Sequence, residues 1–148
     1  MSNDIDRNSP NAMPRLGRLD EIVKKGLQAL QTDGDLAGFL ELDDGRAKAV
    51  LVSPDDGSSS DLAVNALVLP PGFLNPAHSH RAGELLIALH GRGTVTIDEG
   101  PQLGITEGDV VFVPPMASHS LSASSEGPLL LLAVMAKPSN KTDKANID

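Results

Sequence analysis

The sequence contains no cysteine, no tryptophan and no tyrosine, and only three of its 148 residues are phenylalanine. The absence of cysteine excludes disulfides, thiolate nucleophiles and cysteine-ligated metal, so any metal ion must be bound through nitrogen and oxygen atoms. Because aromatic residues are so scarce, the core has to pack from Leu, Val and Ala, which supply most of the 40% hydrophobic fraction.

Basic residues and long apolar runs are also missing. Twelve Lys and Arg stand against twenty Asp and Glu, a net charge of −8, and no basic stripe is present that could replace counterions on nucleic acid. No apolar run reaches the roughly 18 to 20 residues that cross a bilayer, and the first residues, MSNDIDRNSPN, lack the pattern of a signal peptide. We therefore expect a cytoplasmic protein that binds neither nucleic acid nor membrane.

The length suits a single domain, which we place at residues 19–136. Residues 1–18 show no periodicity and predict a flexible N-terminal arm, and residues 137–148 predict a polar tail. From Leu19 to Leu30 apolar residues recur at helical spacing, with acidic residues in the first turn, which predicts a short amphipathic helix. Its apolar stripe needs a partner, so we expect it to pack on the outside of the domain or on a second subunit of a homodimer.

After Gly34 the pattern changes to short aliphatic runs separated by Gly, Pro and Asp, which predicts an all-β domain. About eight strands in about a hundred residues indicate a closed or sandwiched antiparallel sheet. The predicted strands are Phe39–Leu42, Ala47–Val52, Leu62–Leu69, Glu84–Leu89, Thr94–Asp98, Val110–Val113, His119–Ser122 and Leu129–Met135.

Three of the four histidines are candidate site residues, and they lie in two separate segments of the sequence. His78 and His80 are one residue apart, and side chains at i and i+2 of a strand share a face. Glu84 follows after RAG, where Gly83 allows a bulge or a positive φ that turns the carboxylate back towards the imidazoles. His119 can reach the same point only through the tertiary fold. An isolated H-x-H would be better explained by exposed loop histidines, so the spacing alone leaves both interpretations open.

The segment Gly72-FLNPA-His78-Ser-His80-RAG-Glu84-LLIALH-Gly91 resembles the first motif of the cupin family at every position. The segment Gly108-DVVFV-Pro114-Pro-Met116-AS-His119-SLS-Ala123 resembles the second motif, with two departures. Met116 stands where the family commonly has a turn glycine, and a positive φ costs a non-glycine residue roughly 1 to 2 kcal/mol. Ala123 stands where the family has asparagine, which removes a possible polar neighbour. Neither change removes a ligand.

The resemblance implies a fold and a metal site. The fold is a single conical antiparallel β-barrel, the double-stranded β-helix of cupins, here with a short N-terminal helix. Inside it one divalent transition metal ion (Fe, Mn, Ni, Zn or Cu) would be held by His78, His80, Glu84 and His119. Three neutral imidazoles and one carboxylate leave a net charge of +1 and open coordination positions, and the donor set does not choose among the metals.

Several other residues are candidates for the pocket. Leu86 and Ala88 share parity with Glu84, and Leu121 shares parity with His119, so all three should face inward, where they pack in the core and also line a substrate pocket. Arg46 and Lys48 alternate with apolar residues; a solvated sheet face is the favoured interpretation, and an anion site at the barrel mouth is the alternative. His90 is interpreted as a solvated turn residue and not as a ligand.

Without tyrosine or cysteine, acid-base chemistry falls to Glu84, to a metal-bound water or to the substrate itself, and Glu84 is the candidate catalytic residue. The leading interpretation is a mononuclear-metal oxygenase of dioxygenase type acting on a small chelating substrate. The resemblance also allows a metal-dependent lyase, decarboxylase or isomerase, and a non-catalytic module that senses a metal or small molecule, because one fold hosts many functions.

Overall fold

The computed structural model describes residues 18–30, 38–57, 59 and 61–136. The predicted tail and all but the last residue of the predicted arm lie outside these ranges. The predicted helix is confirmed as α1 (Leu19–Ala29), and a short 3-10 helix, η2 (Pro54–Asp56), follows in the turn-rich loop. Within the described residues, no helix has the length or the apolar character needed to cross a membrane.

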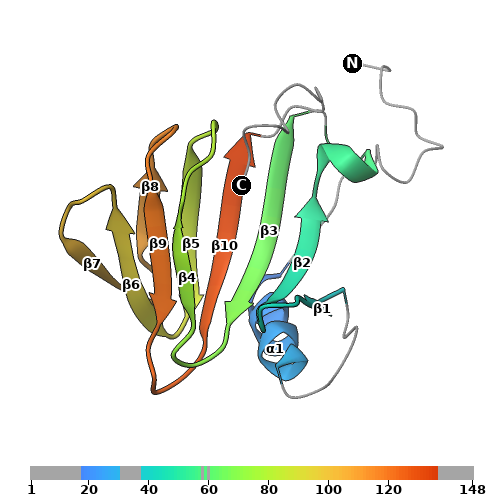
Figure 1. The fold of residues 1–148 in the computed structure, drawn as a ribbon. Helices are drawn as coiled ribbons and strands as arrows, with labels where there is room; N and C mark the ends of the chain where they lie inside the picture. The colour runs from blue at the N-terminus through green and yellow to red at the C-terminus, as the bar shows by residue number, and fades with distance from the viewer. Residues whose placement is uncertain (1–17, 31–37, 58, 60, 137–148) are drawn as a thin grey trace.

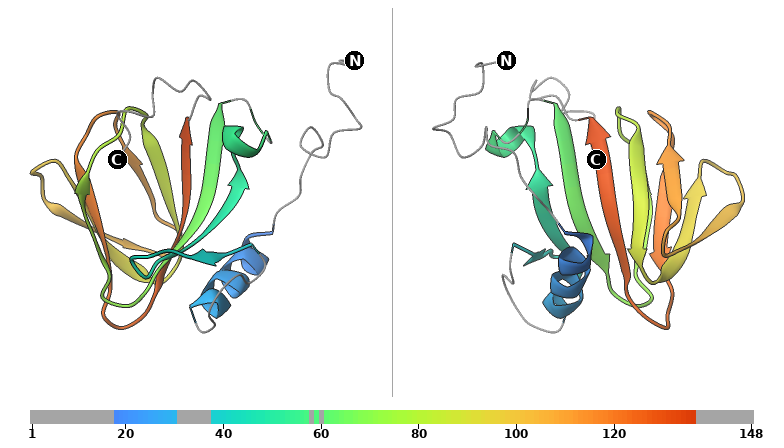
Figure 2. Two further views of the ribbon diagram at one scale, coloured as in Figure 1. Left: turned by 45° about the vertical axis from the view of Figure 1, so that its right-hand side comes forward. Right: turned by 180° about the vertical axis from the view of Figure 1, so that it is seen from behind.

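Two antiparallel sheets form the domain, which confirms the predicted all-β class (Figure 1). The six-stranded sheet has the order β1 (Leu40–Glu41), β2 (Ala47–Val52), β3 (Leu62–Leu69), β10 (Leu129–Ala136), β5 (Glu84–His90) and β8 (Val110–Val113). The four-stranded sheet has the order β4 (Leu74–His78), β9 (His119–Ala123), β6 (Arg92–Ile97) and β7 (Gln102–Thr106). The left view of Figure 2 shows the two sheets curving around a common interior, as in the expected barrel.

The strands β2, β3 and β8 begin and end where the sequence predicts, and β1, β5, β6, β9 and β10 differ by one or two residues at their ends. The pattern did not predict β4 and β7. Both are edge strands of the smaller sheet, so much of their surface faces water and they lack the apolar alternation of a half-buried strand. Pro76 lies within β4, a position that proline tolerates at a sheet edge because a hydrogen bond is not required there.

The core lies in two layers, one on each face of the six-stranded sheet. The layer between the sheets is aliphatic, and its fully buried members include Leu69, Leu86, Val95, Val113, Leu129 and Leu131. The outer layer lies beneath α1 and contains Ala29, Phe39, Ala47, Ala49, Ala66, Val68 and Leu130. The right view of Figure 2 shows α1 against this outer face, which satisfies the apolar stripe of the helix within the same chain.

The glycine in the middle of α1 is explained by this packing. Gly26 is buried, and a Cβ atom there would lie 2.5 Å from Cδ1 of Leu130 and 2.9 Å from Cγ2 of Val68. A residue that weakens an isolated helix thus permits the close approach of helix and sheet.

Candidate metal centre

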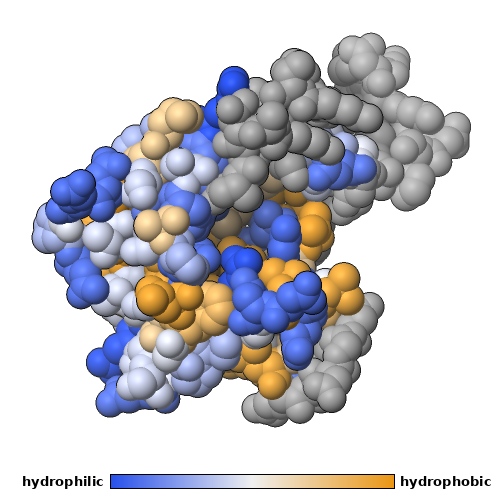
Figure 3. All heavy atoms as spheres, viewed as in Figure 1, coloured by the Kyte–Doolittle hydropathy of each residue, from blue (hydrophilic) through white to orange (hydrophobic). Residues whose placement is uncertain are grey.

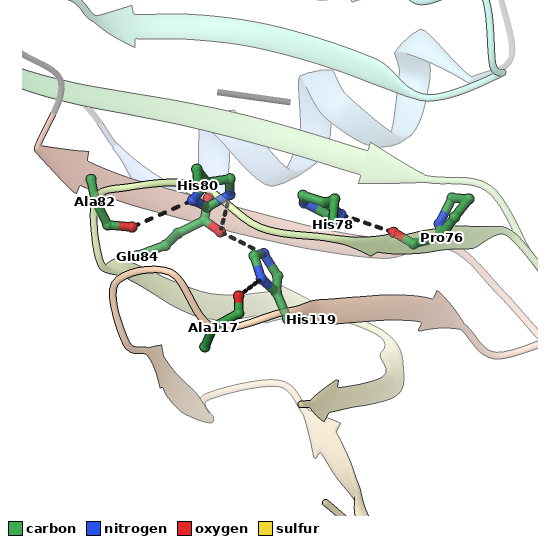
Figure 4. A network of polar contacts seen from close by, with 7 residues as sticks. All are labelled: Pro76, His78, His80, Ala82, Glu84, Ala117 and His119. Atoms are coloured by element: carbon green, nitrogen blue, oxygen red, sulfur yellow. Dashed lines mark hydrogen bonds and ion pairs between the residues drawn. The ribbon is translucent and has the colours of Figure 1, made fainter. Parts of the chain in front are cut away.

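Four side chains, carried by both sheets and by the segment that joins them, lie close together in the interior (Figure 4). His78 ends β4 and His119 begins β9, and the two residues are paired across these strands. Glu84 begins β5 in the larger sheet, where it pairs with Met135 and Val113. The connection from β4 to β5 carries His80, so a short segment links the two sheets at the site.

Two details of the sequence argument need correction. His80 does not lie on the same strand as His78, because β4 ends at His78; the two rings nevertheless lie close, with centroids 5.5 Å apart. Gly83 does not adopt a positive φ. A Cβ atom there would instead lie 3.0 Å from the ring of Phe112, so the glycine permits the close approach of β8.

The ligand atoms of His78, His80 and His119 all lie within 4.8 Å of one another, a separation at which three histidines can hold one metal ion. Oε1 of Glu84 lies 3.6 Å from Nε2 of His80 and 3.4 Å from Nε2 of His119. His119 is 1% exposed and His80 and Glu84 are 7% and 8% exposed, whereas His78 is half-buried. The residues that the cupin resemblance implies are therefore brought together.

Backbone carbonyl groups orient the three imidazole rings. Nδ1 faces the carbonyl oxygen two residues earlier in His78 and His119, at 2.8 and 3.1 Å, and two residues later in His80, at 3.4 Å (Figure 4). A carbonyl oxygen can only accept a hydrogen bond, so an Nδ1 that is hydrogen-bonded to it carries the proton and donates. The lone pair of each neutral ring is then on Nε2, and metal-binding histidines are commonly oriented by such contacts. Three imidazole nitrogens and a carboxylate suit a divalent transition metal ion, and the residues fit one.

The loop before His119 forms a turn with a positive φ at Met116, the residue that stands in place of the motif glycine. Met116 has φ 68°, the left-handed conformation that a glycine would adopt without strain, and its N–H donates to the carbonyl oxygen of His80 at 2.8 Å. Its side chain is 64% exposed. Ala123 is buried in the core between the sheets, where its N–H donates to the carbonyl oxygen of Phe73 at 2.9 Å. An apolar methyl group fits this position.

A cavity of about 490 Å³ opens beside the four residues. On the face drawn in Figure 3 the surface is hollowed, with hydrophilic and hydrophobic residues around the hollow. His78, His80 and Glu84 line the cavity together with Leu42, Arg46, Lys48, Ala63, Asn65, Leu67, Asn75, Pro76, Ala77, Ala133 and Met135. The wall is thus more polar than the aliphatic composition suggested.

The remaining sequence candidates separate into three groups. Arg46 and Lys48 line the cavity, in agreement with the alternative that the sequence argument ranked second. The predicted pocket residues Leu86, Ala88 and Leu121 are buried in the core between the sheets, behind the cavity-lining side chains. His90 lies at the opposite end of β5 from Glu84, in a separate depression of about 260 Å³, roughly 20 Å along the strand.

The sequence argument did not consider Asn65 and Asn75, which line the cavity from β3 and β4. Asn65 could have been noticed, because it is the one polar residue in the run LAVNALVL, and an amide that is partly buried in an apolar strand needs a reason. The sequence around Asn75 gave little indication of its place in the cavity, because β4 itself was not predicted.

Comparisons with known proteins agree with this architecture. The family model described as a cupin domain matches residues 66–135. A predicted oxalate decarboxylase from Thermotoga maritima is 28% identical over 62% of this chain and 80% of its own, with a TM-score of 0.56. KdgF from Halomonas sp. is 15% identical over 70% of this chain and 89% of its own, with a TM-score of 0.60. DMSP lyase DddQ from Ruegeria pomeroyi DSS-3 is 24% identical over 64% of this chain, with a TM-score of 0.57.

The family match, both motifs and the fold support a cupin domain over residues 66–135, the part of the chain that the family model covers. The chain spans about half the length of the DMSP lyases that it matches, 47% and 48%. None of the curated proteins matches the sequence.

Proposed function

We propose that this chain is a metal-dependent cupin enzyme, in which His78, His80, Glu84 and His119 hold one divalent transition metal ion and a small substrate chelates that ion. The observation that carries the proposal is the grouping of the ligand atoms of His78, His80 and His119 within 4.8 Å of one another, with the Glu84 carboxylate beside His80 and His119. When bound, the ion supplies a Lewis acid that polarises a substrate oxygen.

Glu84 has a second role in this proposal. Within the described cavity wall it is the only carboxylate, and that wall contains no Tyr or Cys. Glu84 is the first residue of β5, and its Oε1 faces His80 and His119. We propose that Glu84 accepts a proton from the substrate as well as binding the metal, and so acts as the catalytic base.

The cavity supports a small-molecule substrate. Its volume of about 490 Å³ lies within the range of small-ligand sites, about 300 to 1,000 Å³. An organic acid or hydroxy acid of a few carbon atoms would fit between the four-residue centre and the opposite wall. Oxygen atoms on such a substrate are suited to chelating a divalent ion.

For the reaction we propose non-oxidative cleavage, by a decarboxylase or lyase, ahead of the oxygenase that the sequence argument favoured. The observation behind this order is the likeness to a predicted oxalate decarboxylase at 28% identity. A dioxygenase-type oxygenase is the second candidate, because the same donor set can bind a redox-active metal. The two differ in whether dioxygen is consumed.

The test begins with elemental analysis of protein purified without chelator, in the wild type and in His119→Ala. We expect about one transition metal ion per chain in the wild type and a large loss in the variant. A screen of small carboxylates is then run with and without oxygen, with carbon dioxide release and oxygen uptake recorded. Turnover that needs metal but no oxygen supports cleavage, and oxygen uptake supports the oxygenase. A wild type without metal contradicts the proposed function, and metal without turnover favours the sensing alternative.

A further inference from the structure

We propose that the cavity recognises a substrate with two ends, in which a carboxylate or phosphate group remote from the metal is bound by Arg46 and Lys48. The substrate class would be a small organic dianion rather than any chelating molecule, a specificity that rests on the metal centre proposed above. The two cationic side chains line the same cavity as His78, His80 and Glu84.

The sheet separates the two ends by a suitable distance. Lys48 lies on β2 and Glu84 on β5, and β3 and β10 lie between these strands. Three strand spacings amount to about 14 Å across the sheet. In addition, the register places Lys48 in line with Ala88, four residues along β5 from Glu84. Both side chains reach into the cavity from these positions, which leaves room for a short carbon chain that joins two anionic groups.

Arg46 is held in place by neighbours. Its Nε and one terminal nitrogen each lie 2.9 Å from Oδ2 of Asp44, and its guanidinium carbon lies 5.9 Å from the centre of the Phe73 ring. The side chain is 24% exposed. A guanidinium carries five N–H donors, so the contact with Asp44 leaves donors for an oxyanion. An arginine fixed in this way loses little entropy when it binds an anion.

The charged residues around the cavity favour anion binding, although the net charge of the whole chain does not. The protein carries a net charge of −8, which repels anions on average. Arg46 and Lys48 are the basic residues of the described cavity wall, where Glu84 is the only acidic one, and Asp44 is paired with Arg46. A divalent ion at the proposed centre would offset the charge of Glu84, so the inside of the cavity would be positive.

Amide groups complete the polar surface. Asn65 on β3 and Asn75 on β4 line the cavity from the two opposed sheets, and both are half-buried. An amide can donate to an oxyanion, and it can also accept from a hydroxyl group of the substrate. Convergent polar groups of this kind fix the orientation of a ligand.

The test compares succinate with succinamate, in which one carboxylate is replaced by a neutral amide of similar shape. Binding to the metal-loaded full chain is measured by calorimetry, and 3-phosphonopropionate serves as the phosphate arm. We expect the wild type to prefer succinate or 3-phosphonopropionate over succinamate by about tenfold or more, the range of a hydrogen bond to a charged group. The preferred dianion distinguishes a carboxylate from a phosphate site.

Lys48→Met and Arg46→Gln should each reduce this preference, and Lys48→Arg should retain it. Lys24→Met is the matched control, because Lys24 is exposed on α1, on the outer side of the sheet, and should leave the preference unchanged. Metal content is measured for every variant. An unchanged preference in Lys48→Met and Arg46→Gln with full metal would overturn the proposal, as would equal binding of succinate and succinamate by the wild type. A wild type that takes up no metal contradicts the metal centre; Lys48-dependent binding of succinate to that metal-free protein would still support the anion site.

Discussion

At the scale of single residues, Glu84 is the sharpest probe of the proposed chemistry. Glu84→Gln nearly preserves volume and keeps one oxygen that can bind metal, but it removes the negative charge and the proton-accepting role. We expect the variant to retain part of its metal and to lose turnover by about 10²- to 10⁴-fold, the usual contribution of a catalytic acid or base. The measurements are elemental analysis and steady-state rates on the substrate found by the screen. Full metal and full turnover would make Glu84 a replaceable ligand and assign the base elsewhere.

Met116 allows a prediction about stability that does not depend on the metal. Its φ of 68° strains a residue with a Cβ atom, and its side chain is largely exposed, so little packing is lost when it is removed. Met116→Gly should raise the free energy of unfolding by about 1 kcal/mol, measured by urea denaturation. Met116→Ala is the control, because it removes the same side chain but keeps the Cβ atom, and it should not stabilise the protein. Equal effects of the two substitutions would show that the backbone conformation is not the cause.

At the scale of elements, two motif glycines of positive φ should differ in how much they tolerate a side chain. Gly72 and Gly91 have φ 75° and 84°. A Cβ atom on Gly91 would lie 2.1 Å from the carbonyl oxygen of Pro128, whereas nothing lies within 4 Å of one on Gly72. Gly72→Ala should cost about 1 kcal/mol from the backbone alone. Gly91→Ala should cost more than about 3 kcal/mol, because the chain between β5 and β6 must also move.

Thermal or urea unfolding of both variants decides the comparison. The difference matters for the fold, because Gly91 joins the two sheets through the turn from β5 to β6. Similar stabilities of Gly72→Ala and Gly91→Ala would mean that the Pro128 segment adjusts freely.

Most of the strands that the sequence predicted have side chains that face a core; β1, whose two residues are exposed, is the exception. Strands β2, β3, β5, β8 and β10 form the larger sheet with β1, and their aliphatic runs are visible because one or both faces are buried. The edge strands β4 and β7 were missed because a strand that faces water carries no such pattern.

The four candidate ligands could be predicted from their motif spacing, but the polar wall opposite them could not. Lys48 and Asn65 line the same cavity as the candidate ligands only through the pairing of β2, β3, β10 and β5, and this register follows from the folded sheet rather than from any local pattern. The position of Arg46 in the cavity wall is equally hard to predict from the sequence, since a charged residue beside a strand is more often on a solvated surface.

At the scale of the whole molecule, we predict a homodimer, but through a different surface from the one that the sequence suggested. The helix α1 packs on its own sheet, so its stripe does not require a second subunit. Val110 and Phe112 are instead 58% and 57% exposed on β8, which is an edge of the larger sheet. An edge strand with exposed apolar side chains favours association with a second copy.

Light scattering of the full chain should give the mass of a dimer, and Phe112→Ser should shift the mass towards the monomer. Leu103→Ser is the control, because Leu103 is also exposed, at 43%, but lies on β7 at the far edge of the smaller sheet. A wild type that is monomeric at all concentrations, or a dimer that Phe112→Ser leaves intact, contradicts the prediction.

The position of the four ligand candidates has a consequence for how the two sheets separate during local unfolding. His78 and His119 belong to the smaller sheet and Glu84 to the larger one, and the two sheets otherwise meet mainly through side chains of the core. An ion held by all four residues would act as a cross-link between the sheets, so that neither could detach without releasing it. Amide hydrogen exchange should therefore slow together in β5 and β9 when metal is added, whereas α1, on the outer face, should exchange at nearly the same rate with and without the ion.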